Sequence, residues 1–375
     1  MKNSHCLSSS IIVMKYSGVW KPDGLSLRKE IAYIIFGVVT QVFLFYFIIL
    51  AEIGYVYTFL EDVERMVDAA VLLLSHLVQA VKVLTIIVRQ GRIKRMIEMA
   101  DGSAFTKPES KLKAIRETTI RLAAIIGNVI LCSACNTGIF WCIVPALNTE
   151  LTLPLRTAYP FDIDGPYIFA AMYAYSAISV TVSGVGDAAE NFLVSGMFTI
   201  ASAQLDVLRE ELKAIGTEGS TDNYEKAKLC VKYHQQIIGY VEEMADIFGL
   251  PMFCQFVTSS VVICMTIYKI TVTKEPVEMV TMVFYLICVF MELLMYCYPG
   301  DVLLYKSMLV AEAAYPSEWS GDQKTSRVLL LTALRSQRPL AIDAGGIFRV
   351  SLPTAAAVVK TSYSYYALLR QQLSK

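Results

Sequence analysis

Apolar residues in this chain gather in seven long runs, separated by polar or charged segments. A helix that crosses the hydrocarbon core of a bilayer needs about 20 mainly apolar residues, and each run is long enough. We therefore predict membrane-spanning helices over residues 31–52, 66–88, 120–144, 167–200, 247–268, 279–298 and 343–369.

Composition supports the same class of protein. Of the 375 residues, 55% are hydrophobic and only 18% are charged, and the mean hydropathy is +0.51. A soluble domain is typically about a quarter charged. Because membrane helices share one packed bundle, we predict an all-α polytopic membrane protein that forms a single domain over residues 1–375.

The distribution of positive charge predicts the orientation. Most lysine and arginine residues lie in the N-terminal tail and in the loops after the second, fourth and sixth runs. Loops rich in these residues remain on the cytoplasmic side. The N-terminus is therefore predicted to be cytoplasmic and the C-terminus extracellular, which is opposite to the orientation of a G-protein-coupled receptor.

Two further segments, about residues 199–246 and 299–342, are helical in pattern but too polar to cross a membrane. Apolar positions recur in them at helical spacing, with charged residues between. We expect these segments to extend the fourth, fifth and sixth spans into a cytoplasmic layer of helices.

The last run differs from the others because hydroxyl groups and one cation lie along it. One face, read at steps of three and four residues, is small and mostly polar. With the flanking Lys360 and the terminal Gln372, this stripe consists of Thr354, Ala357, Lys360, Thr361, Ser364, Leu368, Gln371 and Gln372. The stripe fits either the lining of an aqueous pore or a seam between membrane helices, which also favours small and hydroxyl-bearing residues.

A second candidate site comes from the outer halves of the spans, which supply an apolar and aromatic set with few hydroxyls. The candidate ligand-binding residues are Leu73, Phe140, Trp141, Met172, Tyr173, Ser176 and Tyr268. Such a set suits a pocket for a small volatile molecule. The alternative is an aromatic belt, because Trp and Tyr also collect at membrane interfaces.

Catalytic and metal-binding motifs are missing from the sequence. There is no His-Glu-x-x-His, no phosphate-binding glycine loop and no Cys/His cluster with metal spacing. We therefore predict a protein that is not an enzyme and has no cofactor. His76 is expected to be satisfied by a neighbouring helix rather than by a ligand, and Asp187 and Glu190 to lie at the interface rather than in a proton relay.

The C-terminal region resembles that of insect odorant receptors. The resemblance is carried by Tyr298, Ser307, Ala311, Tyr315, Trp319, the run Arg335-Ser336-Gln337-Arg338-Pro339-Leu340, Ala344-Gly345, Ser351-Leu352 and Ser362-Tyr363-Ser364-Tyr365. It implies an odorant-binding tuning subunit of a ligand-gated, non-selective cation channel whose last helix lines the pore. It also implies a co-receptor partner in a heterotetramer, a plasma-membrane location in a sensory neuron, and a small aromatic ligand that is phenol- or indole-like.

Two alternatives remain open at this point. A gustatory-type chemoreceptor channel would share the architecture, although the Ser362-Tyr363-Ser364-Tyr365 ending resembles the odorant branch. A G-protein-coupled receptor would share the number of helices, but the predicted orientation is against it. A secondary transporter is disfavoured because no inverted repeat with paired broken helices is visible.

Overall fold

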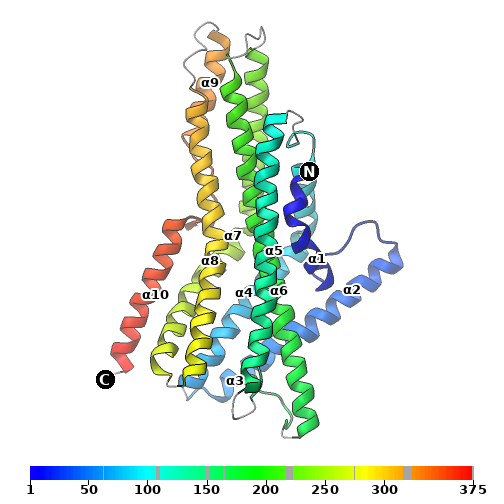
Figure 1. The fold of residues 1–375 in the computed structure, drawn as a ribbon, viewed down its shortest axis with the longest axis vertical. Coiled ribbons are helices and arrows are strands. Elements are labelled where there is room, and N and C mark those ends of the chain that lie inside the picture. The colour runs from blue at the N-terminus through cyan, green and yellow to red at the C-terminus, as the bar shows by residue number, and fades with distance from the viewer. Residues whose placement is uncertain are drawn as a thin grey trace.

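The structure is a computed structural model that describes residues 1–61, 63–106, 110–147, 152–163, 165–216, 223–273, 275–315 and 323–373. It is almost entirely helical. Figure 1 shows a long bundle in which α9 lies at one end of the long axis and the C-terminus lies toward the other.

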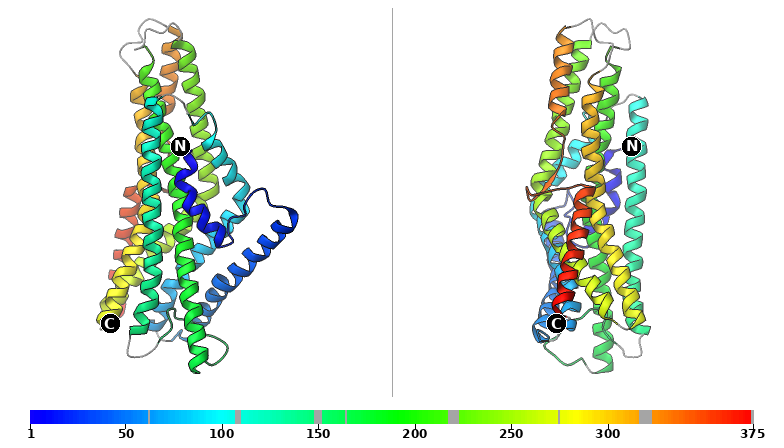
Figure 2. Two further views of the ribbon diagram at one scale, coloured as in Figure 1. Left: turned by 45° about the vertical axis from the view of Figure 1, so that its right-hand side comes forward. Right: turned by 90° about the vertical axis from the view of Figure 1, so that its left-hand side faces the viewer.

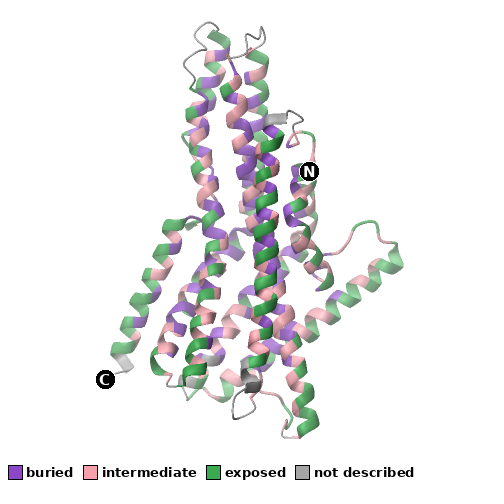
Figure 3. Cartoon of the chain, in the orientation of Figure 1, coloured by how far each residue is buried: buried purple, intermediate pink, exposed green. Residues whose placement is uncertain are grey.

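The N-terminal region is a pair of short helices followed by a long, apolar one. A 3₁₀ turn, η1 (Asn3–Leu7), leads into α1 (Ser8–Tyr16). Helix α2 (Leu27–Gln41), a π-helical turn η2 (Val42–Tyr46) and α3 (Phe47–Thr58) then continue as one helical stretch of 32 residues. Most residues of α2 are exposed (Figure 3), and many are large and apolar, as expected for a surface that faces lipid.

Five long helices make up the body of the molecule. They are α4 (Val63–Asp101), α5 (Ser110–Leu147), α6 (Pro166–Ala214), α7 (Asn223–Val272) and α8 (Pro276–Ala313). Helix α7 is the central one, since 61% of its most apolar window is buried, against 17–33% in the other candidate spans.

The chain ends with α9 (Gln323–Ser336), a two-stranded hairpin and α10 (Leu352–Leu373). Strands β1 (Asp343–Ala344) and β2 (Phe348–Arg349) pair antiparallel. The predicted last span began at residue 343, but the helix begins only at Leu352. Gly345 and Gly346 have φ values of 59° and 71°, a left-handed conformation that breaks a helix and that glycine adopts without steric cost.

Six helical stretches among the described residues are long and apolar enough to cross a membrane, judged by length and composition. Helix α10 has the length, at 22 residues, but Lys360 and its hydroxyl groups make it more polar. Together these elements form a seven-helix polytopic membrane fold.

The two ends of the bundle are packed differently. The end near α9, here called the anchor layer, comprises residues 199–214, 223–246 and 299–313 together with α9. Its core belongs to a large continuous apolar cluster that extends from the anchor layer into the adjoining turns of α4, α6, α7 and α8. Leu205 within the layer and Phe198, directly before it, are fully buried in this cluster. The other end, here called the membrane half, holds a much smaller cluster built on Val67, Val71, Val262, Ile263 and Val289.

The N-terminal turn packs into the anchor-layer core. The Asn3 amide donates to the carbonyl oxygens of Ala100, at 2.5 Å, and Phe105, at 3.2 Å. Cys6 and Leu7 belong to the core cluster, and burial raises the pKa of the Cys6 thiol to about 12. The first residues of the chain are therefore a structural part of the bundle.

Candidate functional site

A cavity of about 450 Å³ opens inside the membrane half, between α4, α5, α6, α7 and α8. Its walls are mainly apolar, with a few polar groups from each helix. This size and composition are typical of a site for a small, mostly apolar ligand.

Aromatic rings form one wall of the cavity. Trp141 on α5 and Tyr285 on α8 meet edge to face with ring centroids 6.2 Å apart, and Phe284 also lines the space. The Tyr285 hydroxyl lies 2.8 Å from the Ser75 hydroxyl on α4, which fixes the ring. Rings held in this way offer faces and edges on which an aromatic ligand can pack.

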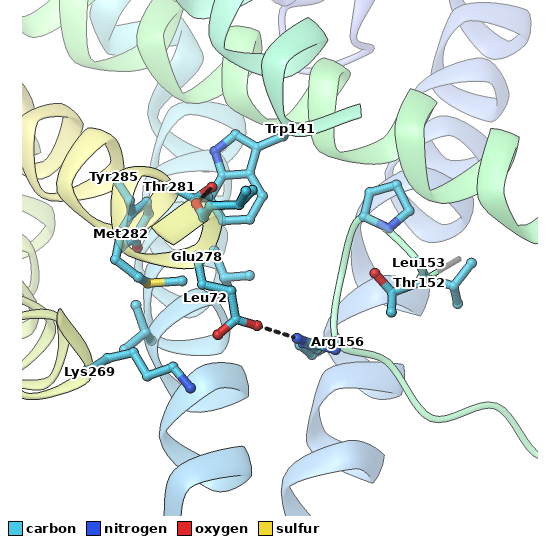
Figure 4. A pocket seen from close by; sticks show the side chains of 13 residues that line it. Leu72, Trp141, Thr152, Leu153, Arg156, Lys269, Glu278, Thr281, Met282 and Tyr285 are labelled. Atoms are coloured by element: carbon cyan, nitrogen blue, oxygen red, sulfur yellow. Dashed lines mark hydrogen bonds and ion pairs between the residues drawn. The ribbon is translucent and has the colours of Figure 1, made fainter. Parts of the chain in front are cut away.

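A smaller pocket of about 90 Å³ lies next to this cavity and shares Leu72, Trp141 and Tyr285 with it. This pocket, here called the vestibule, is shown in Figure 4, with Trp141 and Tyr285 on one side and Arg156 and Glu278 at its opening. The Arg156 Nη2 and Glu278 Oε1 atoms are 3.5 Å apart, so an ion pair links the loop after α5 to the start of α8. The shared rings separate the two spaces.

The inner end of the cavity is polar and charged. Lys82 on α4 donates hydrogen bonds to Asp187 (2.9 Å) and Asn191 (2.8 Å) on α6 and to Glu292 (2.7 Å) on α8. The Asn191 amide in turn donates to Asp187 and Glu292, at 2.8 and 2.9 Å. Asp187, Asn191 and Glu292 line the cavity, whereas the Lys82 side chain is only 5% exposed.

This network gives Asp187 partners that the sequence did not predict. Asp187 was expected to lie at the interface, but it is a member of a charge cluster that joins three helices. Glu190 is buried and lines a separate small pocket of about 20 Å³. Both carboxylates therefore pack inside the bundle, and their position at the membrane interface stays a prediction.

His76 also lines the cavity, and its Nδ1 atom lies 2.9 Å from Oε2 of the buried Glu52 on α3. The expectation that a neighbouring helix satisfies this histidine is confirmed. Among the described residues there is no group of three or more His, Cys, Asp or Glu side chains arranged to hold a metal ion.

Of the ligand-binding residues predicted from sequence, Trp141 lines the cavity. Leu73 is adjacent to the lining residue Leu72, and the Phe140 ring packs against Phe284 at 5.0 Å. The remaining four lie nearer the end of the bundle and outside the lining: Met172, Tyr173, Ser176 and Tyr268. On α6 and α7 the cavity uses residues about one to four turns closer to the anchor layer, such as Val180, Ser183, Gln255 and Ser259.

Helix α10 packs on α7 through one narrow face. Ala355, Ser362 and Tyr366 are buried, and the hydroxyl oxygens of Ser362 and of Ser260 on α7 lie 3.3 Å apart, within hydrogen-bond distance. The views in Figures 1 and 2 place α10 at the side of the membrane half.

The predicted polar stripe lies on a different face. Thr354 is half-buried, and the exposed members of the stripe are Ala357, Lys360, Thr361, Ser364, Leu368 and Gln371; the Gln372 side chain lies outside the described part. The seam within the subunit is therefore Ala355, Ser362 and Tyr366. The exposed stripe faces away from α7, toward lipid, water or another subunit.

Sequence reasoning missed Lys82, Glu292 and Gln255. A signal was available for the first two, because an ionisable residue inside an apolar span is costly and usually functional or paired. Gln255 gave no such signal, since a single amide in a span has little cost when a neighbour bonds it.

The chain is similar to known proteins over most of its length. It matches the family described as 7tm Odorant receptor over residues 62–363. The odorant receptor Or1 of Anopheles gambiae is 20% identical over 401 aligned positions, which cover 97% of this chain and 95% of that receptor. Odorant receptor 30a of Drosophila melanogaster is 24% identical over 262 positions, covering 68% of this chain and 69% of its own.

Among solved structures, the fold is similar to that of the insect olfactory receptor OR5 from Machilis hrabei, solved alone and in complex with eugenol. The TM-score is 0.83 for the complex, at 15% identity and with 97% of each chain covered. For the structure without eugenol it is 0.82, with 96% covered. The seven-helix fold and the family match agree, and the chain belongs to the insect odorant receptor family, as an odorant-sensing, multi-pass membrane receptor rather than an enzyme.

Proposed function

We propose that this chain is the odorant-binding tuning subunit of a ligand-gated, non-selective cation channel. The observation that carries the proposal is the position of α7 between the cavity and α10. Ser259 on α7 lines the cavity, and the hydroxyl of the next residue, Ser260, lies within hydrogen-bond distance (3.3 Å) of the Ser362 hydroxyl on α10. A ligand that shifts α7 would therefore act directly on the helix that carries the polar stripe.

The ligand is a small volatile molecule that binds in the cavity of the membrane half, and we infer a phenol- or indole-like aromatic. The aromatic wall of Trp141, Phe284 and Tyr285 supports this class. The OR5 complex with eugenol is a case in which a receptor of the same fold binds a small aromatic molecule. Of the sequence-predicted contacts, Trp141 is the one with direct support from the cavity lining.

The pore is lined by the α10 stripe, from Thr354 at its inner end to Gln371 and Gln372 at its outer end. Exposure of this stripe on a single subunit supports the proposal, because a pore at the centre of a tetramer is built from surfaces that each subunit leaves open. Leu368, which is 59% exposed, is the bulky apolar member of the stripe and forms the gate.

The chain works in the plasma membrane of a sensory neuron, with its N-terminus and the anchor layer in the cytoplasm. The positive charge of the N-terminal tail and of the loops after the second, fourth and sixth spans supports this orientation. It puts the vestibule at the extracellular side, so odorants would pass Arg156 and Glu278 and then the Trp141 and Tyr285 rings. The partner is the family co-receptor, in a heterotetramer.

Co-expression with and without the co-receptor tests this proposal, with current recorded against an odorant panel. We expect current only in the mixed assembly, and we expect it to survive blockade of G-protein signalling. Current that disappears under that blockade would show a G-protein-coupled receptor instead.

A further inference from the structure

At the inner end of the cavity, the cluster of Lys82, Asp187, Asn191 and Glu292 uses its own hydrogen-bond donors internally, so this cluster presents acceptors to the ligand. An ammonium group has three N–H donors, and Lys82 uses them on Asp187, Asn191 and Glu292. Both hydrogen-bond donors of the Asn191 amide are also used, on Asp187 and Glu292. The Tyr296 hydroxyl donates to the Asn191 oxygen.

The two carboxylates are more open than the cation that they bind. Asp187 and Glu292 have side-chain exposures of 25% and 20%, against 5% for Lys82. Both carboxylates line the cavity and Lys82 does not. The cluster holds one cation against two carboxylates, so the ligand meets the negative side of it.

A separate residue on α7 points to the same chemistry. Gln255 is 5% exposed and lines the cavity. Its Nε2 atom donates to the Ser259 hydroxyl at 3.1 Å, but its Oε1 acceptor is buried with no hydrogen-bond partner. A buried acceptor without a partner is costly, and a ligand that donates a hydrogen bond would remove this cost.

We propose that the cavity recognises the polar end of its ligand as a hydrogen-bond donor. It binds alcohols, phenols and primary amines on a mainly apolar skeleton, and it rejects the corresponding methyl ethers and carboxylates. A methyl ether has no donor to give to Gln255, Asp187 or Glu292. A carboxylate would add a further negative charge next to two others, at a distance where like charges repel strongly in a low dielectric.

This inference rests on the proposed function, since it names the ligand class of the same cavity. The test is a panel in which each skeleton is presented in four forms: alcohol or phenol, primary amine, methyl ether and carboxylic acid. Current is recorded from the chain expressed with its co-receptor. We expect the half-maximal concentration to rise about tenfold from alcohol to ether, the effect of one lost hydrogen bond, and we expect no response to the acids.

The possible outcomes separate the two proposals. Silence toward the whole panel, while an agonist of the co-receptor still opens the channel, would count against the proposed function. Responses that favour the ethers or the acids would overturn donor recognition and leave the odorant-gated channel intact.

A variant of Gln255 provides the second test, because it leaves the charge cluster untouched. Gln255→Met keeps the size of the side chain and removes the acceptor. We expect the response to the alcohol to weaken about tenfold and the response to its ether to stay the same, at equal surface expression. Equal shifts for alcohol and ether would mean that Gln255 contributes shape alone and would overturn its role as acceptor.

A third variant changes the charge cluster itself. Glu292→Gln places an amide donor at the inner end of the cavity and should improve the response to ethers relative to alcohols.

Discussion

The anchor layer and the membrane half are built from the same long helices but are packed for different purposes. In the anchor layer and at its border with the spans, large side chains such as Tyr240 and Phe198 are almost completely buried in one continuous core. In the membrane half, the helices enclose a cavity of about 450 Å³ beside a small apolar cluster. In the proposed orientation the anchor layer lies in water, where the hydrophobic effect drives the helices together, whereas lipid gives membrane helices no such drive.

The difference teaches where each property of the receptor resides. A tightly packed core fixes the relative positions of α6, α7, α8 and α9, so it behaves as a rigid base. The cavity of the membrane half can take up and release a ligand, and its space allows α7 to shift. A filled core would resist such a shift. Stability is therefore expected to depend on the anchor layer, and ligand response on the membrane half.

Matched phenylalanine substitutions should separate the two regions most strongly. Phe198→Ala empties a fully buried site in the large apolar cluster, at the border of the anchor layer, and we expect a loss of roughly 3–5 kcal/mol in the free energy of unfolding. Phe284→Ala acts on a half-buried ring at the cavity wall and should leave folding almost unchanged. Thermal melting of the detergent-solubilised receptor, with surface expression in cells, measures both; equal destabilisation would contradict the contrast.

Trp141→Ala should produce the largest loss of ligand response. If the indole packs on the odorant, truncation costs roughly 2–4 kcal/mol of binding, which is a rise of roughly thirty- to a thousandfold in half-maximal concentration. The control is Tyr173→Phe, which removes a hydroxyl that bonds the Cys142 carbonyl outside the cavity lining. A shift under about threefold for Trp141→Ala, at intact expression, would assign this residue to an aromatic belt.

Lys360 is expected to limit conduction by assemblies made of this chain alone. It is exposed beside Thr361 and Ser364, so four copies would surround a symmetric pore. Two unit charges about 10 Å apart at an effective dielectric near 20 repel by roughly 1.7 kcal/mol, and permeating cations would meet all four. Lys360→Gln should raise conductance and calcium permeability of the mixed channel. If the mixed channel keeps the conductance and calcium permeability of the wild type, and the variant expressed without the co-receptor gives no current, Lys360 does not face the ion path.

The smallest effect is expected at the proposed gate. Leu368→Ala or Leu368→Ser should raise the ligand-free current several-fold, because a smaller or polar side chain is wetted more easily in a narrow pore. Basal current recorded at matched surface expression measures this, with Tyr363→Ala, on a different exposed face of α10, as the control. A basal current equal to that of the wild type would exclude Leu368 as the gate.

Hydropathy predicted the membrane helices well because a bilayer imposes a length on any helix that crosses it. The start of the last helix was less visible. Gly345 and Gly346 lie next to an apolar run, but their backbone forms the turn of a hairpin. The Gly345 N–H donates to the Gly249 carbonyl on α7 at 2.9 Å, a contact across almost 100 residues that no local pattern contains.

The ligand site was only partly predictable. Trp141 was found because a large aromatic residue near the outer end of a span is conspicuous. The polar inner end of the cavity was not predicted, because Lys82, Asp187 and Glu292 come from three helices and meet only in the folded bundle. The second difficulty was the depth of the cavity in the bundle. Periodicity predicts which face of a helix is buried, but it does not predict at which position along α6 and α7 the helices move apart to form the cavity.

The central claim is that the cavity of the membrane half holds the odorant. Cys288 on α8 lines this cavity, and Cys288→Trp would fill much of it with an indole. Val283, on the same helix, is 40% exposed and lies outside the lining, so Val283→Trp is the matched control. We predict that Cys288→Trp abolishes the odorant-evoked current while surface expression and the response to a co-receptor agonist persist, and that Val283→Trp responds like the wild type. An unchanged odorant response in Cys288→Trp would contradict the account.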